Sequence, residues 1–262
     1  MTPTSFVCTT CGTAYIPAMQ PPAACPVCTD ERQYINPQGQ SWTTLKQVNR
    51  THKNIIDNIG EGLYALYTTP SFAIGQRAHL LKTPHGNILW DCLANLDATT
   101  IELINQLGGI QKIAISHPHY YTTMADWSHA FGAPVYIHQR DADWIPRRDF
   151  DLQLWDGLKN ELLPGATLIN SAGHFDGGTV LHYDRVLLSG DVIQVAPNLK
   201  TVSFMYSYPN YIPLNKKSIL HIQASLEGLA FDAIYGAFGH YITQQARKAF
   251  DDSIARYLKI FE

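Results

Sequence analysis

The sequence has little charge and no long apolar run. Charged residues make up 16% of the 262 residues, and 19 lysines and arginines against 22 aspartates and glutamates leave a formal net charge of −3. This balance, without a basic stripe, argues against nucleic acid as a partner. No apolar stretch approaches the ~20 residues of a membrane span. The first residues lack the basic and apolar regions of a signal peptide, so we expect a cytoplasmic protein.

Glycine and proline are not enriched either. The chain has 18 glycines and 15 prolines, which excludes collagen-like and low-complexity sequences. A chain of this length buries roughly 70–75% of the surface that it exposes when unfolded. It is therefore long enough for one large domain with its own core and a small appendage.

Cysteine is rare over most of the chain but concentrated at its start. Four of the five cysteines form the patterns C-T-T-C-G and C-P-V-C; they are Cys8, Cys11, Cys25 and Cys28. Two C-x-x-C turns can place four thiolates around one tetrahedral ion, and disulfides are disfavoured where no export signal is present. The pattern resembles both a rubredoxin-like iron knuckle and a zinc ribbon, and four thiolates alone do not choose between iron and zinc. A structural role and electron transfer both remain open.

The chain divides by composition into three parts. Residues 1–35 form the four-cysteine knuckle, residues 36–60 are a polar connector, and residues 61–262 are the main domain. In that domain, short β-favouring runs alternate with helical spacing. Strands are expected at 63–69, 75–82, 87–92, 111–116, 135–138, 167–172, 179–183, 186–189 and 233–237. Helices are expected at 97–107, 122–131 and 242–260.

Residues that commonly bind metals follow directly after four of these strands. They are His117 and His119, His174, Asp191 and His240. Strand ends converge on a common rim in sheet-based folds, where ligands usually bind. Imidazoles and a carboxylate gathered at one rim form a metal site with room for water or substrate.

The order and spacing of these residues resemble the metallo-β-lactamase superfamily. The family motifs H-x-H-x-D-H, G-H, S/T-G-D and a late G-H match residues 117–122, 173–174, 189–191 and 239–240. Asp91 falls where the family commonly has a structural aspartate. The resemblance implies an α/β (α+β) fold, the αββα metallo-β-lactamase sandwich, preceded here by the small four-cysteine knuckle.

The first motif departs from the family pattern at two positions. Tyr121 and Thr122 stand where the family has the aspartate and histidine that bind a second metal. A tyrosine hydroxyl, with a pKa near 10, and a neutral threonine hydroxyl are poor ligands for a divalent ion. The resemblance therefore predicts a single metal in the pocket.

A metal-dependent hydrolase is the leading hypothesis. By the resemblance, Zn²⁺ held by His117, His119 and His174 lowers the pKa of its bound water toward about 7. Asp191 completes the ligand set or orients that water, and Tyr121 is expected to hydrogen-bond an oxyanion. His240 is expected either to bind the metal or to be a catalytic pocket histidine that binds substrate or donates a proton. The expected substrate is a small ester, thioester or lactone, by analogy with the fold.

Two other interpretations remain open. Related folds hold one Fe(II) for oxygen chemistry, as in a persulfide-dioxygenase-like enzyme, and the four-cysteine centre is then an electron relay that needs a redox partner. A binding protein without catalysis is the third. In each case the sequence favours a small molecule over nucleic acid or membrane, and leaves open whether the chain forms a homodimer.

Overall fold

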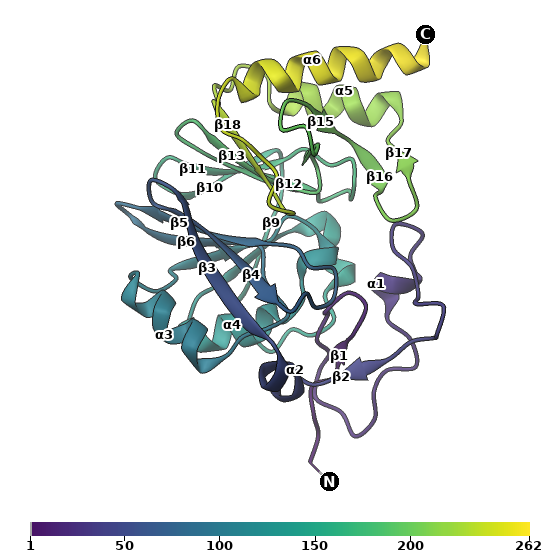
Figure 1. Ribbon diagram of the computed structural model, residues 1–262, viewed down its shortest axis with the longest axis vertical. Helices are drawn as coiled ribbons and strands as arrows, with labels where there is room; N and C mark the ends of the chain where they lie inside the picture. The colour runs from purple at the N-terminus through teal and green to yellow at the C-terminus, as the bar shows by residue number, and fades with distance from the viewer. Residues whose placement is uncertain (1) are drawn as a thin grey trace.

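The computed structural model describes residues 2–262 and consists of two β-sheets packed face to face, with helices on both outer faces (Figure 1). The first sheet has the order β3-β4-β5-β6-β7-β8-β9, antiparallel up to β6 and parallel from β6 to β9. Its strands are β3 (Lys53–Gly60), β4 (Leu63–Thr69), β5 (Ala78–Thr83), β6 (Gly86–Trp90), β7 (Lys112–Ala114), β8 (Val135–His138) and β9 (Leu152–Trp155).

The second sheet has the order β10-β11-β12-β13-β18-β19, and its one parallel pair is β13 with β18. Its strands are β10 (Lys159–Leu163), β11 (Ala166–Asn170), β12 (Thr179–Tyr183), β13 (Val186–Gly190), β18 (Ala233–Gly236) and β19 (Tyr241–Ile242). The predicted αββα sandwich is confirmed.

Two pairs of helices cover the outer faces of the sandwich (Figure 1). Helices α3 (Ala98–Gln106) and α4 (Met124–Phe131) pack on the first sheet, and α5 (Lys216–Ser225) and α6 (Ala246–Leu258) pack on the second. The C-terminal helix starts four residues later than predicted, because Tyr241 and Ile242 pair with β18 as strand β19. None of the helices in residues 2–262 is long and apolar enough to cross a bilayer.

Alternate side chains along each strand belong to different hydrophobic cores, one between the two sheets and one beneath the helices on each outer face. In β6, Ile88 and Trp90 pack between the sheets, whereas Leu89 packs beneath α3 and α4. In β13, Leu188 faces the first sheet and Leu187 faces α5 and α6. Successive side chains point to opposite faces of a strand, so strands covered on both sides read as continuous apolar runs.

The N-terminal residues 2–43, called here the four-cysteine segment, lie against one end of the sandwich (Figure 1). The segment contains the pair β1 (Val7–Cys8) and β2 (Trp42–Thr43) and the short helix α1 (Pro26–Thr29). Helix α2 (Leu45–Thr51) then leads directly into β3. The predicted connector at 36–60 is wrong for its last eight residues, since β3 pairs with β4 along its whole length. This edge strand is half exposed and polar, which is why its composition resembles a linker.

Shorter elements complete the chain around the rim of the sandwich. They are β14 (Gln194–Val195), β15 (Val202–Ser203), β16 (Met205–Ser207) and β17 (Ile212–Pro213), with 3₁₀ turns at η1 (Pro118–Tyr120), η2 (Gln139–Trp144) and η3 (Lys259–Phe261). The hairpin β16–β17 reaches the four-cysteine segment, as Figure 1 shows.

Candidate metal centres and pocket

The turns that follow three strands bring four metal-binding side chains together. One ligand atom from each of His117, His119, His174 and Asp191 lies within 4.8 Å of the others, and all four residues are buried. His117 and His119 follow β7, His174 follows β11, and Asp191 follows β13. Strands of both sheets therefore contribute to one cluster, as the strand-end argument predicts.

Two glycines allow these turns to form. Gly190, immediately before Asp191, has φ +51°, and a Cβ there would lie 2.5 Å from the Oγ of Ser116. Gly173, immediately before His174, has φ +87°, and a Cβ there would lie 3.0 Å from Ile222. Both positions combine a left-handed backbone with close packing, which only glycine tolerates without strain.

Hydrogen bonds on the outer side of the cluster orient two imidazoles. Nδ1 of His117 lies 2.8 Å from Oγ of Ser116, which itself donates to Asp91 at 2.8 Å. Nδ1 of His174 lies 3.1 Å from the carbonyl oxygen of Met205. The Nε2 atoms of both rings are thereby directed inward, as in metal sites whose histidines are fixed by an outer partner.

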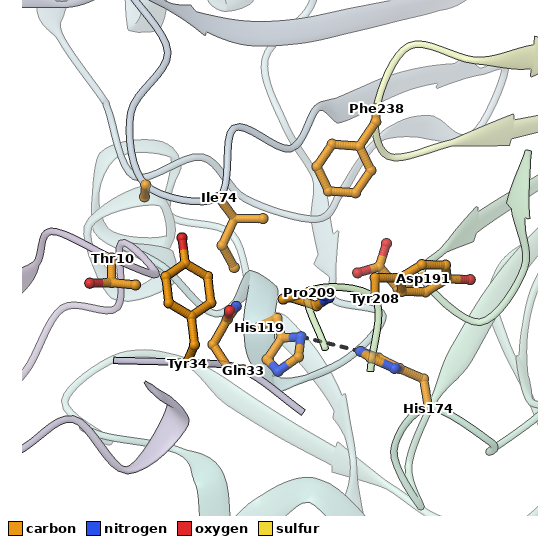
Figure 2. A pocket seen from close by; sticks show the side chains of 11 residues that line it. Thr10, Gln33, Tyr34, Ile74, His119, His174, Asp191, Tyr208, Pro209 and Phe238 are labelled. Carbon is orange, nitrogen blue, oxygen red and sulfur yellow. Dashed lines mark hydrogen bonds between the residues drawn. The ribbon is translucent and has the colours of Figure 1, made fainter. Parts of the chain in front are cut away.

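The inner nitrogen atoms meet at the centre of the cluster. Nε2 of His174 lies 3.2 Å from Nδ1 of His119 (Figure 2). Nε2 of His117 has no hydrogen-bond partner within residues 2–262, although it is buried. A buried ring nitrogen is normally paired, so this one fits a site that holds a cation.

The two oxygens of the Asp191 carboxylate have different surroundings. Oδ1 accepts hydrogen bonds from the hydroxyl of Tyr120 at 2.6 Å and from Nε2 of Gln194 at 3.2 Å. Oδ2 faces the cluster, 3.6 Å from Nε2 of His117. One oxygen is thus held by the protein and the other is left for a ligand.

Burial sets the protonation of the cluster. Desolvation, followed by the nearby charge of His117, lowers the pKa of His174 to about 3, and desolvation also lowers the pKa of His119 well below its usual value. Burial would raise the pKa of Asp191, but the nearby imidazoles of His117 and His174 and the hydrogen bond from Tyr120 outweigh burial and lower that pKa. His119 and His174 are therefore neutral and Asp191 is ionised at neutral pH, and these are the forms that bind a divalent cation.

The cluster opens into a cavity of about 250 Å³ (Figure 2). His119, His174 and Asp191 lie on its inner side, and the remaining lining residues are uncharged; they are Thr10, Gln33, Tyr34, Ala73, Ile74, Tyr208, Pro209 and Phe238. The metal-binding cluster is therefore accessible from this cavity.

Two of the predicted site residues lie elsewhere. The hydroxyl of Tyr121 donates to the backbone oxygen of Asp141 at 3.0 Å, and its ring lies in the core beneath the first sheet. It cannot contact an oxyanion in the pocket from there, so the expected role of Tyr121 is wrong. His240 belongs neither to the cluster nor to the cavity lining in the described chain, where Phe238 takes that place.

The residue that the sequence did not single out is Tyr120. It was only a variable position of the H-x-H-x-D-H motif, yet its hydroxyl is fully buried and bonded to Asp191. Gln194, three residues after Asp191, was missed as well. An unusual aromatic pair, Tyr120-Tyr121, was the available signal.

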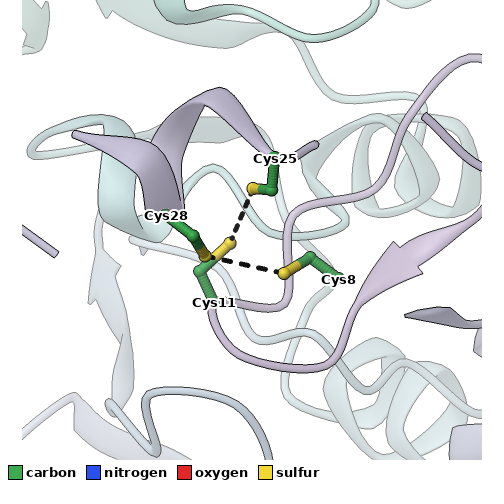
Figure 3. Close-up of side chains that lie close together, drawn as sticks. All are labelled: Cys8, Cys11, Cys25 and Cys28. Carbon is green, nitrogen blue, oxygen red and sulfur yellow. Dashed lines mark hydrogen bonds between the residues drawn. The ribbon is translucent and has the colours of Figure 1, made fainter. Parts of the chain in front are cut away.

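The four cysteines form a second cluster of free, buried thiols (Figure 3). The Sγ atoms of Cys8 and Cys28 are 3.6 Å apart, and those of Cys11 and Cys25 are 3.5 Å apart. Four sulfurs placed ~2.3 Å from one ion at the corners of a tetrahedron would lie ~3.8 Å from one another. The arrangement therefore fits a single tetrahedral metal.

Two polar side chains donate hydrogen bonds to sulfur atoms of this cysteine cluster. The hydroxyl of Tyr15 donates to Sγ of Cys25 at 3.1 Å, and Nε2 of Gln40 donates to Sγ of Cys8 at 3.2 Å. Such hydrogen bonds stabilise thiolates, the form in which cysteine binds a metal.

Comparison with known proteins gives one close relative and many similar folds. No protein-family model matches the chain. The uncharacterized protein YmaE of Bacillus subtilis (strain 168) is 44% identical over 262 residues, covering 97% of this chain and 96% of YmaE.

Solved structures with the same fold are much less similar in sequence. A B3 metallo-β-lactamase with an active-site glutamic acid is 15% identical, with a TM-score of 0.54 over 83% of this chain and 94% of that one. The metallo-β-lactamase FIM-1 from Pseudomonas aeruginosa, in its mono-zinc form, is 12% identical, with a TM-score of 0.57 over 78% and 96%. A flavo-diiron protein from Thermotoga maritima is 16% identical, with a TM-score of 0.52 over 78% and 62%.

These likenesses agree with the geometry of the site. The sandwich is that of the metallo-β-lactamases, and the cluster of three histidines and one aspartate fits a metal-dependent hydrolase fold. The chain has the metallo-β-lactamase fold, with a four-cysteine group near its N-terminus, and belongs to the same family as YmaE of Bacillus subtilis.

Proposed function

We propose that this protein is a hydrolase that uses one metal ion in the pocket to cleave a small ester, thioester or lactone. The observation that carries the proposal is the cluster itself, with three imidazoles and one carboxylate converging at the inner side of a small cavity. Three histidines and one aspartate are a donor set that suits Zn²⁺. A Zn²⁺ ion bound there would lower the pKa of a bound water and polarise a carbonyl group.

The protein groups around the cluster have separate tasks in this reaction. His117 and His174 are fixed by their outer hydrogen bonds, so they hold their inner nitrogens in place without reorganisation. Oδ2 of Asp191 is free to accept a proton from the attacking water, while Tyr120 keeps Oδ1 occupied. The rest of the cavity lining is uncharged, so no other charged side chain competes with these groups for the reacting carbonyl.

Metal analysis should find two ions per chain, one in the pocket and one in the cysteine cluster. A second pocket ion is not expected, because the hydroxyl of Tyr121 donates to the backbone oxygen of Asp141 and Thr122 offers only a neutral hydroxyl, a poor ligand for a divalent ion. The measurement is elemental analysis of fully loaded protein, followed by a crystal structure. Two ions about 3.5–4 Å apart near His117 would contradict this prediction.

Replacing Tyr120 with phenylalanine should lower kcat about 10–100-fold, the loss typical of a group that orients a metal ligand. The variant removes only the hydroxyl that holds Asp191. The matched control is Tyr121→Phe, since that hydroxyl bonds the backbone of Asp141 away from the cluster. The steady-state kcat of both variants is the measurement, and equal losses would remove Tyr120 from the mechanism.

An iron enzyme is the second candidate, and one feature of the packing favours it. Trp144 packs against the cysteine cluster and contacts the ring of Phe175 at 5.5 Å between centroids. Phe175 in turn contacts His119 at 4.9 Å and His174 at 5.2 Å. Two aromatic rings thus form a packed path between the two metal-binding clusters, along which electrons could pass.

The experiment that separates these candidates compares zinc-loaded with iron-loaded protein. Both forms are assayed without oxygen against ester, thioester, lactone and persulfide substrates, and then in air. We expect the zinc form to hydrolyse an acyl substrate without oxygen. Turnover that needs iron and oxygen, in a red protein that dithionite bleaches, would favour the oxidoreductase instead.

A further inference from the structure

The four-cysteine segment forms one wall of the pocket. Thr10 lies within the first C-T-T-C turn, and Gln33 and Tyr34 follow the last cysteine closely in sequence; all three line the cavity. Figure 2 shows them on one side of the cavity and Tyr208 and Asp191 on the other. A substrate bound to the metal-binding cluster would therefore contact residues that the cysteine cluster positions.

Hydrogen bonds from the sandwich fix this wall. Nδ2 of Asn210, in the β16–β17 hairpin, donates to the backbone oxygens of Glu31 and Gln33, both at 2.9 Å. Oγ of Ser207 donates to the backbone oxygen of Arg32 at 3.0 Å. The backbone of this wall is thus held in a fixed position, because the carbonyl groups of Glu31, Arg32 and Gln33 all accept hydrogen bonds from the hairpin.

Apart from the metal ion proposed above, the cavity offers no cationic side chain to a negatively charged substrate. Its lining contains no lysine or arginine in residues 2–262. Arg32 is close, but its guanidinium lies 3.8 Å from the centre of the Phe175 ring and donates to Asp30 at 2.6 and 3.0 Å. Carboxylates and phosphates are usually held by arginine or lysine, so an anionic acyl group would lack a partner here.

Size and polarity restrict the substrate further. The cavity volume of about 250 Å³ lies just below the range of ~300–1,000 Å³ that is typical of small-molecule pockets. Ile74, Phe238 and the ring of Tyr34 provide apolar surface around it. This apolar surface suits a short aliphatic chain.

We propose that the four-cysteine segment is the acyl-selecting wall of the site, and that it selects short, uncharged acyl groups through Tyr34. This inference rests on the proposed hydrolase function and names its substrate class. Tyr34 is 48% exposed, so its side chain can be changed without disturbing a core. It is a specificity residue and takes no part in the chemistry.

The test uses two esters of similar size, methyl butyrate and monomethyl succinate, with metal-loaded protein and with acid release followed in a pH-stat. The parent protein should hydrolyse the butyryl ester with a kcat/KM at least about tenfold higher. Tyr34→Arg places a cation on the wall and should shift this ratio at least about tenfold toward the succinyl ester. Tyr211→Ala is the control, because Tyr211 is 83% exposed and lies outside the lining.

A binding measurement distinguishes failure of the hydrolase proposal from failure of the proposal about the wall. It uses calorimetry with the butyryl and succinyl 4-nitroanilides. If the butyryl anilide binds better and Tyr34→Arg reverses the preference while neither ester is cleaved, the wall is supported and the hydrolase proposal fails. If the esters are cleaved but Tyr34→Arg leaves the ratio of the two kcat/KM values unchanged, the proposal about the wall is overturned and the hydrolase proposal stands. Absence of both binding and cleavage overturns both.

Discussion

A His174→Ala variant is expected to bind one metal ion per chain instead of two and to lose hydrolysis. His174 contributes one of three inner nitrogens, and its removal leaves only His117, His119 and Asp191 to hold the ion. The loss of activity should exceed about 100-fold, the upper limit for residues that merely orient a ligand. Elemental analysis and steady-state kinetics measure the two effects.

The matched control for this variant is His129→Ala. His129 lies on the exposed side of α4, and its Nε2 contacts the backbone oxygen of Asp149 at 2.7 Å, outside the cluster. This variant should keep both metals and full activity. If His174→Ala also keeps two metals, the three-histidine site is wrongly assigned.

The residues of the pocket cluster could be predicted from sequence because each lies within five residues of the end of its strand. His174 comes four residues after β11 ends, and Asp191 is the first residue after β13. Buried strands read as continuous apolar runs, so the point where each run stops also locates the rim of the sheet. A strand and the residue after it are local in sequence, and local features need no knowledge of the tertiary fold.

The role of the two tyrosines could not be predicted in this way. Pro118 to Tyr120 form a 3₁₀ turn, in which successive side chains point about 120° apart. Tyr120 therefore faces Asp191, whereas Tyr121 turns into the core toward Asp141. The motif places both residues near the site, but only the backbone geometry of this turn decides which hydroxyl reaches it.

The contribution of the four-cysteine segment to the pocket could not be predicted from the sequence either. The cysteine spacing indicates a metal-binding unit, but nothing in residues 2–43 shows which surface that unit covers. Its position depends on contacts between residues far apart in the chain, such as Asn210 with Gln33 and Thr122 with Ala14. Such pairs depend on the finished fold, and no local pattern encodes them.

The largest expected effect on structure comes from Cys11→Ser. Binding of a structural zinc is worth about 10–16 kcal/mol in small zinc-dependent units, so a segment with so little apolar core of its own should unfold without its metal. The core around the cysteines consists of Cys8, Cys11, Cys25, Cys28 and Val27 with a few partly buried neighbours. We expect one metal fewer per chain and rapid proteolysis within residues 2–43.

The sandwich should survive this change, because the ligands of the pocket metal all come from residues 117–191. The variant is therefore expected to retain the pocket metal while losing the wall formed by Thr10, Gln33 and Tyr34, which raises KM more than it lowers kcat. Cys92→Ala is the control, since Cys92 is buried beneath the first sheet, outside the cysteine cluster. Elemental analysis, limited proteolysis and separate kcat and KM values test the prediction. If Cys11→Ser leaves KM unchanged although the segment is cleaved, residues 2–43 do not contact the substrate and the cysteine cluster has a purely structural or redox role.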